Sequence, residues 1–263
     1  MRVKHEKEFE SGYTPLITKQ NHPEMMGLEF GIVNALAGEQ YSFCFDQEAV
    51  YVLVEGKIRL SWEDEVCDLA REDCFHEGAT LLHVPSNTKV VIEGVAEASE
   101  IAVAHTENEK TFPTKLLHPS DCLVENEMRG AGQMQETSTR MVRTFFDRTN
   151  CPETNFYLGE TVNLPGKWSS YPPHFHVEPE MYYYRMYPEN GWGFAEYGED
   201  AFKIHNRDLM GMPENVTHAQ VVMPGYSEYY LWVIRLREEA LVTNIVKEYA
   251  WVTDPEAKYF PEI

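Results

Sequence analysis

The sequence is poor in positive charge. Lysine and arginine number 22 against 43 aspartates and glutamates, which gives a formal net charge of −21 at neutral pH. A field of that sign repels phosphate backbones, so the chain is expected to bind no nucleic acid. It also slows the approach of an anionic substrate, unless a local cation or a metal ion reverses the sign.

Long apolar runs are missing as well. No stretch approaches the roughly 20 consecutive apolar residues that cross a bilayer, so no membrane partner is expected. The first eight residues are charged and carry no apolar signal core. The five cysteines are Cys44, Cys67, Cys74, Cys122 and Cys151, and none forms a C-x-x-C pair. Scattered cysteines in odd number are typical of reduced thiols, and a cytoplasmic location is therefore expected.

Helical periodicity is also scarce, and the best candidate is the short segment 238–241. Strand patterns dominate instead. In the first half they cover residues 49–60, interrupted by a turn at Glu55-Gly56, and residues 80–85, 89–92 and 100–104. In the second half they cover residues 156–162, 181–186, 208–213 and 229–235. Short strands separated by turns at this spacing predict an all-β sandwich or barrel.

The second series of strands resembles the first, which predicts two tandem β units. Residues 208–213 resemble the segment that ends Leu82-His83-Val84-Pro85, and residues 229–235 resemble residues 100–104. The polar stretch 117–122 is the expected boundary between the units. We therefore divide the chain into residues 1–120 and residues 121–263.

The strongest chemical signal is a group of histidines and one acid in the second unit. His174 and His176 are two residues apart, so on a strand both imidazoles point to one face. A hairpin through residues 177–179 would bring Glu180 beside them, and a turn at 213–215 would deliver His218. Three imidazoles and one carboxylate suit a divalent cation and leave a coordination position open. Zinc, manganese, iron and nickel fit this set almost equally.

These residues resemble a known family. Gly166, His174, His176, Glu180 and Gly193 follow the cupin pattern G-x-n-H-x-H-x(3–4)-E-x-n-G, and Pro213 with His218 is similar to the second cupin motif. Wider runs are similar to the 5-deoxy-glucuronate isomerases of myo-inositol catabolism, bicupin proteins related to the 5-keto-4-deoxyuronate isomerases of pectin breakdown. The most specific of these runs are 168–174, 191–194, 223–226 and 228–233, and the Arg129-Gly130-Ala131-Gly132 segment also fits.

The resemblance implies a bicupin fold with two tandem jelly-roll barrels and few short helices. Its metal ligands would be His174, His176, Glu180 and His218 in the second barrel. The first barrel has no His-x-His between residues 40 and 105, and His76 and His83 stand alone, so a packing role without metal is expected there. The chain departs from the family in having only Val177-Glu178-Pro179 between His176 and Glu180. This departure leaves the identity of the uronate open.

The implied activity is aldose–ketose isomerisation of a deoxyuronic acid, with a sugar acid as the small-molecule partner. Strand alternation places Glu180, Tyr182 and Tyr184 on one face and Met181, Tyr183 and Arg185 on the other, so the first face can line the metal cavity. The other candidate residues are Glu178 or Tyr184 as base, Lys167 and Lys203 as cations for the substrate carboxylate, and Gln220 as a hydrogen-bond donor.

Other functions also fit this motif. A cupin dioxygenase would use iron at the same ligands but would require oxygen. A sugar-binding cupin would bind a ligand without turnover. Within the family, the substrate would be 5-deoxy-glucuronate or 5-keto-4-deoxyuronate. Pairing of barrel faces into a homo-oligomer is left open by the sequence.

Overall fold

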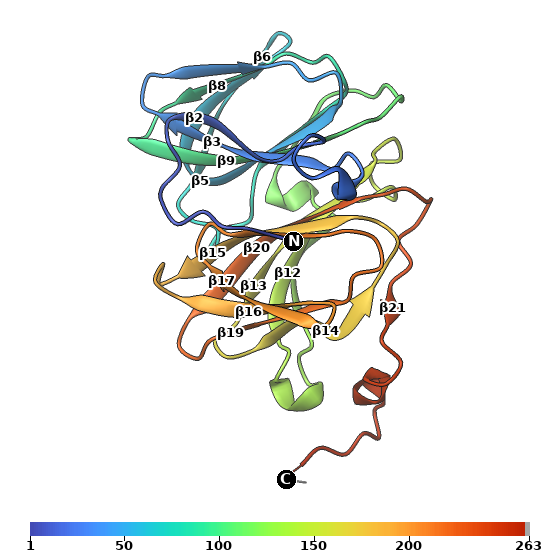
Figure 1. Cartoon of the computed structure of the whole chain (residues 1–263). Coiled ribbons are helices and arrows are strands. Elements are labelled where there is room, and N and C mark those ends of the chain that lie inside the picture. The colour runs from blue at the N-terminus through green and yellow to red at the C-terminus, as the bar shows by residue number, and fades with distance from the viewer. Residues whose placement is uncertain (261–263) are drawn as a thin grey trace.

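The computed structural model describes residues 1–260, and β-strands dominate it. The strands form a nine-stranded, a seven-stranded and a five-stranded sheet, and the named strands pair antiparallel throughout. Figure 1 shows two β units stacked on each other, the first half of the chain above the second. The all-β, cupin-type prediction is confirmed.

The first unit is the nine-stranded sheet. Its strands are β2 (Gly12–Ile17), β3 (Glu29–Leu36), β4 (Gln40–Phe43), β5 (Glu48–Trp62), β6 (Glu65–Arg71), β7 (Leu81–Val84), β8 (Val90–Gly94), β9 (Ala98–Thr106) and β10 (Lys115–Leu117). The main path runs β10-β7-β5-β9-β3-β2, while β6 and β8 pair with β5 and β4 pairs with β8. The long strand β5 therefore belongs to both layers of this unit.

The second unit consists of two sheets. Its strands are β11 (Val124–Arg129), β12 (Arg140–Phe146), β13 (Phe156–Asn163), β14 (Trp168–Phe175), β15 (Glu180–Tyr187), β16 (Trp192–Tyr197), β17 (Asp200–His205), β18 (Leu209–Met212), β19 (His218–Val222), β20 (Ser227–Arg235) and β21 (Asn244–Ile245). The seven-stranded sheet runs β1-β18-β15-β20-β13-β12-β11, and the five-stranded sheet runs β17-β16-β19-β14-β21.

The expected division at residue 120 falls between β10 and β11, but it misplaces the chain start. Strand β1 (Arg2–Val3) pairs with β18 of the second unit, Arg2 opposite Met210. The Arg2 guanidinium lies 2.6 Å from Asp208, and this ion pair helps to hold β1 on the second unit. A two-residue strand carries too little pattern for the sequence to show where it pairs.

The helical content is four short 3-10 segments within residues 1–260. They are η1 (Pro23–Met25), η2 (Pro119–Asp121), η3 (Met134–Glu136) and η4 (Ala250–Thr253). The short helix predicted at 238–241 is wrong, since those residues form bends and irregular backbone. None of the helical segments in this part of the chain combines the length and hydropathy of a membrane-crossing helix.

The predicted turn at Glu55-Gly56 is also wrong. Strand β5 runs through this dipeptide, with a register irregularity between Leu53 and Glu55. Gly56 has a φ of +104°, and a Cβ there would lie 2.4 Å from the Ser99 hydroxyl. The glycine thus lets the strand bend and leaves space for the Ser99 side chain of β9. The strand passes from one layer of the unit to the other without reversing its direction.

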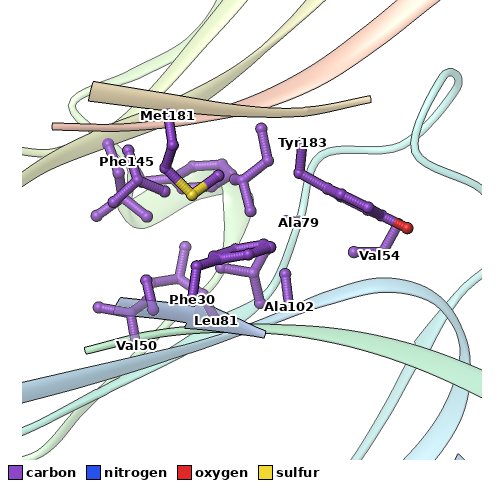
Figure 2. Packing of buried hydrophobic residues seen from close by; sticks show 14 of the residues in the cluster. Phe30, Val50, Val54, Ala79, Leu81, Ala102, Phe145, Met181 and Tyr183 are labelled. Atoms are coloured by element: carbon purple, nitrogen blue, oxygen red, sulfur yellow. The ribbon is translucent and has the colours of Figure 1, made fainter. Parts of the chain in front are cut away.

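The two units share one apolar core. It contains Phe30, Val50 and Ala102 from the first unit and Phe145, Met181 and Tyr183 from the second, and Figure 2 shows these side chains facing one another. Met181 and Tyr183 therefore point toward the first unit, as the alternation of β15 predicts, whereas Tyr182 and Tyr184 belong to the second unit's own core. The first unit thus packs directly against the strand that carries Glu180.

Buried ions also join the two units. Glu160 on β13 is fully buried and accepts hydrogen bonds from Arg71, Arg143 and Tyr229. Arg71 comes from β6 of the first unit, and both arginine side chains are at most 4% exposed. One carboxylate thus serves as the shared counter-charge of two guanidinium groups in the interior.

His83 is buried at the contact between the two units. Its ring stacks on Phe146, and its Nε2 lies 2.7 Å from the buried carboxylate of Glu48. The same carboxylate accepts hydrogen bonds from Thr154 and from the Asn155 backbone N–H. His83 therefore belongs to a polar link between the units. His76 is exposed and pairs with Asp73.

Candidate metal centre

Four segments bring the expected metal ligands together. His174 lies near the end of β14, opposite His218 at the start of β19, and Glu180 begins β15. His176 lies just past β14, in the link that crosses from the five-stranded to the seven-stranded sheet. The expected hairpin through 177–179 is therefore wrong, although the link does place Glu180 beside His176.

Strand β14 begins well before the histidines, at Trp168. It includes Pro172 and Pro173, which sit where the pairing with β19 is interrupted between Ser169 and His174. Proline has no N–H to donate, and the interruption removes the need for one. The ladder resumes at His174, and this fixes His174 opposite His218.

Each of the three imidazoles is oriented by a backbone carbonyl. The Nδ1 atoms of His174, His176 and His218 lie 3.0, 2.7 and 3.0 Å from the carbonyl oxygens of residues 172, 178 and 216. A carbonyl only accepts, so each Nδ1 must carry the hydrogen. The Nε2 lone pair of each neutral ring is then free to bind a cation, the usual arrangement of metal-binding histidines.

Two of these lone pairs converge on one carboxylate oxygen. The Nε2 atoms of His176 and His218 lie 2.9 and 3.1 Å from Glu180 Oε2. His218 Nε2 is buried, and among the described residues it has no hydrogen-bond partner. Lone pairs facing each other at this distance repel unless a proton or a metal ion lies among them. The residues present therefore fit a divalent cation.

His174 lies beside this group. The potential ligand atoms of His176, Glu180 and His218 all lie within 4.8 Å of one another. The His174 ring centroid lies 4.4 Å from that of His218 and 6.4 Å from that of His176. His174 thus lies at the edge of the group and is not one of the three residues whose ligand atoms cluster.

The ionisation of the group favours cation binding. Burial, followed by the neighbouring His218, lowers the pKa of His174 to about 4, so this ring is neutral at pH 7. Burial acts to raise the pKa of Glu180, but the two imidazoles outweigh it and hold the pKa well below its usual range. For His176 burial acts to lower the pKa, but Glu180 outweighs it and the net pKa is raised. The Glu180 carboxylate is therefore ionised, and its negative charge favours a cation beside it.

A cavity of about 240 Å³ opens on these ligands. Its volume is just below the roughly 300–1,000 Å³ of ordinary small-molecule pockets. His174, His176, Glu180 and Tyr182 line it, and the remaining lining residues are Arg129, Arg140, Val142, Tyr157, Thr161, Ser170, Tyr230, Trp232, Ile234, Leu241 and Thr243. His218 lies behind these residues and is 2% exposed.

Several of the expected site residues lie elsewhere. Lys203 is exposed on β17 with its ammonium group 4.5 Å from the Trp192 ring centroid, and it lines a different hollow with Arg2 and Arg207. Lys167 precedes β14 and does not line the cavity either. The structure therefore brings neither expected lysine to the metal ligands.

The two expected bases and Gln220 are buried outside the cavity lining. Tyr184 donates a hydrogen bond of 2.5 Å to the side-chain oxygen of Gln220, and both residues are at most 1% exposed. Glu178 is 1% exposed, and neither of its carboxylate oxygens has a hydrogen-bond partner among the described residues. Tyr182 is the one residue of this predicted set that reaches the cavity within residues 1–260.

Sequence reasoning missed the two arginines of the cavity. Arg129 ends β11 and Arg140 begins β12, more than thirty residues before the ligands in the chain. The available signal was the Arg129-Gly130-Ala131-Gly132 segment, which resembles the family but carried no assigned role. The sequence analysis named Lys167 and Lys203 as the cations instead.

A second buried acid lies deeper in the barrel. Glu228 on β20 is fully buried opposite Asn163 on β13, and a Cβ on Gly193 would lie 2.5 Å from its Oε2. Burial raises the pKa of Glu228 from 4.5 to about 8. Within the described chain neither Glu228 oxygen nor Asn163 Oδ1 has a hydrogen-bond partner, so a protonated Glu228 can donate to Asn163.

We expect Glu228→Gln to remove a pH dependence of stability. The folded chain holds this proton up to about pH 8, whereas the unfolded chain releases it near pH 4.5. Wild-type stability therefore falls across this window by up to about 1.4 kcal/mol per pH unit. Thermal unfolding is measured from pH 5 to pH 8. The Tm of the variant should rise relative to the Tm of the wild type as the pH rises. A constant difference in Tm between the two proteins across this pH range would contradict the raised pKa of Glu228.

Comparison with known proteins places the chain among isomerases. Residues 2–252 match the model of the KduI/IolB family. The 5-deoxy-glucuronate isomerase of Geobacillus kaustophilus is 30% identical over 207 residues, which cover 72% of each chain. The enzyme of the same name from Bacillus subtilis strain 168 is 27% identical over 233 residues, covering 81% of this chain and 83% of the relative.

Solved structures agree on the fold. An IolB-like protein from Salmonella typhimurium superposes with a TM-score of 0.85 at 22% identity and covers 96% of this chain and 99% of its own. Oxalate decarboxylase from Bacillus subtilis, at 14% identity, gives a TM-score of 0.64 over 97% of this chain and 81% of its own. With the family match spanning nearly all the described residues, the chain belongs to the KduI/IolB family and is an enzyme of the isomerase class.

Proposed function

We propose that this enzyme is a divalent-metal-dependent ketol isomerase that converts 5-deoxy-glucuronate to 5-dehydro-2-deoxy-gluconate. Its partner would be the small sugar acid itself. The names of the curated relatives support this substrate. The observation that carries the metal dependence is the convergence of the His176 and His218 lone pairs on Glu180 Oε2, at the wall of the cavity.

His174, His176, Glu180 and His218 would hold the cation. When bound, the cation would supply Lewis-acid stabilisation of the negative charge that develops on the sugar oxygens. The carbonyl partners of the three Nδ1 atoms keep each ring oriented for this role. Zinc, manganese, iron and nickel all remain compatible with the donor set.

A chain of hydroxyl groups beside the ligands can hold and exchange protons with the sugar oxygens. The Ser170 hydroxyl lies 3.1 Å from the Tyr182 hydroxyl and 3.4 Å from that of Tyr230, which also contacts Ser169. Burial, aided by the charge of Glu180, keeps the pKa of Tyr182 well above 10. Tyr182 is therefore a neutral donor, suited to an oxygen that gains negative charge.

The test is incubation of metal-loaded protein with 5-deoxy-glucuronate in deuterated water without oxygen. We expect ketose product with deuterium at the carbon next to the carbonyl, because proton transfer through a base exchanges with solvent. A product free of deuterium would indicate a hydride shift. Turnover that requires oxygen, or binding without any turnover, would contradict the isomerase reaction and favour a dioxygenase or a sugar-binding cupin.

The same assay with 5-keto-4-deoxyuronate tests the substrate within the family. Only three residues separate His176 from Glu180, and the two residues that flank this short link line the cavity. A higher kcat/KM with the 5-keto-4-deoxyuronate than with the 5-deoxy-glucuronate would reassign the substrate but leave the reaction type unchanged.

A further inference from the structure

The cavity that holds the metal ligands also holds two opposed arginines. Arg129 on β11 and Arg140 on β12 are directly opposite in the antiparallel register, and both line the cavity. Like charges facing each other across two strands destabilise a sheet. A chain with a net charge of −21 has many acids that could separate these cations, but only Glu127 pairs with either of them within residues 1–260.

Arg140 is the more unusual of the two. It is 9% exposed, and its protein acceptors among the described residues are the backbone carbonyl and hydroxyl oxygens of Ser138, both bound by Nη1. Neither acceptor carries a charge. Arg129, in contrast, is well exposed and pairs with the Glu127 carboxylate at 2.6 Å.

The other deeply buried arginines of the chain show what is missing at Arg140. Arg71 and Arg143 share the Glu160 carboxylate, and Arg185 pairs with Glu100 and Glu55. Arg140 has no carboxylate partner in the described part of the chain. Burying a cation without an anion is costly, so the missing anion is expected to come from the ligand.

We propose that Arg140, assisted by Arg129, is the receptor for the carboxylate of the substrate. The planar guanidinium fork matches a carboxylate in two parallel hydrogen bonds. The same cavity carries His174, His176 and Glu180, so one sugar acid can present its carboxylate to the arginines and its reacting oxygens to the metal ligands. The inference rests on the proposed function for the identity of the acid, and it assigns Arg140 the role of a specificity residue.

The experiment measures binding rather than turnover. Metal-loaded protein is titrated calorimetrically with D-glucuronate and with D-glucose, which differ in having a carboxylate or a hydroxymethyl group. We expect the wild type to prefer glucuronate at least about tenfold, the worth of one charge-assisted pair. Arg140→Gln keeps a donor for Ser138 but loses the charge, so it should lose this preference while glucose affinity stays the same.

Two further variants complete the test. Arg140→Lys keeps the charge without the fork and should retain part of the preference. Arg237→Gln removes an exposed arginine paired with Glu214 and should change nothing. Metal content of each variant shows that the ligand group is intact.

The outcomes separate the two proposals. A wild type without preference for the acid, or an Arg140→Gln variant that keeps the preference, overturns the role of Arg140. An Arg140→Gln variant that loses affinity for both sugars equally, or that loses its metal, would overturn the role too, because Arg140 would then be structural. The Arg140→Gln variant can lose affinity for glucuronate alone while the wild type isomerises no uronate. In that case the carboxylate receptor stands and the proposed function fails.

Discussion

Replacement of Glu180 by glutamine is expected to abolish divalent-metal binding and, with it, isomerase turnover. The carboxylate supplies negative charge between the His176 and His218 nitrogens, 2.9 and 3.1 Å away. An amide at the same place keeps the size but loses the anion that attracts the cation. Metal affinity should fall by more than the roughly 10–100-fold that follows loss of an outer partner. Metal content after dialysis, together with turnover, measures the effect.

Glu214→Gln is the matched control. Glu214 lies in the turn before His218 and pairs with Arg237 at the surface, about half exposed on its side chain at 51%. This variant should bind metal and turn over as the wild type does. Full metal occupancy in the Glu180→Gln variant would show that the histidines hold the ion without the acid.

Replacement of Glu160 by glutamine should be the most destabilising single change at the contact between the two units. It leaves the buried guanidinium groups of Arg71 and Arg143 without a counter-charge. Breaking a buried ion group by removing one partner costs about 3–5 kcal/mol. Urea unfolding of the variant and the wild type gives the difference.

The control for this change is Asp68→Asn. Asp68 pairs with Arg59 on the surface, with side chains 65% and 47% exposed. Exposed pairs contribute little to stability, so this variant should unfold near the wild type. A Glu160→Gln variant that also unfolds near the wild type would mean that solvent reaches Arg71 and Arg143 and that this ion group contributes little to joining the units.

The strands could be predicted because their pattern is local. Strand β15 alternates between the two cores residue by residue, with Tyr182 and Tyr184 on one side and Met181 and Tyr183 on the other. The Glu55-Gly56 dipeptide was misread as a turn because its role depends on Ser99, more than forty residues away. The pairing of Arg2–Val3 with β18 is equally non-local.

The candidate metal group could be predicted from spacing, but the two arginines of the cavity could not. His176 and Glu180 are four residues apart in the chain, and the pairing of β14 with β19 brings His218 to them. Arg129 and Arg140 reach the same cavity only because β11, β12 and β13 pair in sequence and continue into β20 and β15. Lys167 and Lys203 were nearer to the histidines in the chain, but nearness in sequence did not bring either of them to the cavity.

Anomalous diffraction from crystals of zinc- or manganese-loaded protein is the most direct check on the metal centre. We expect one peak per chain in the second unit, about 2.0–2.3 Å from the Nε2 atoms of His174, His176 and His218 and from the Glu180 carboxylate. At least one further position should face the cavity toward Arg140. A peak at other residues, or no peak at saturating metal, would contradict the metal-dependent isomerase proposed for this protein.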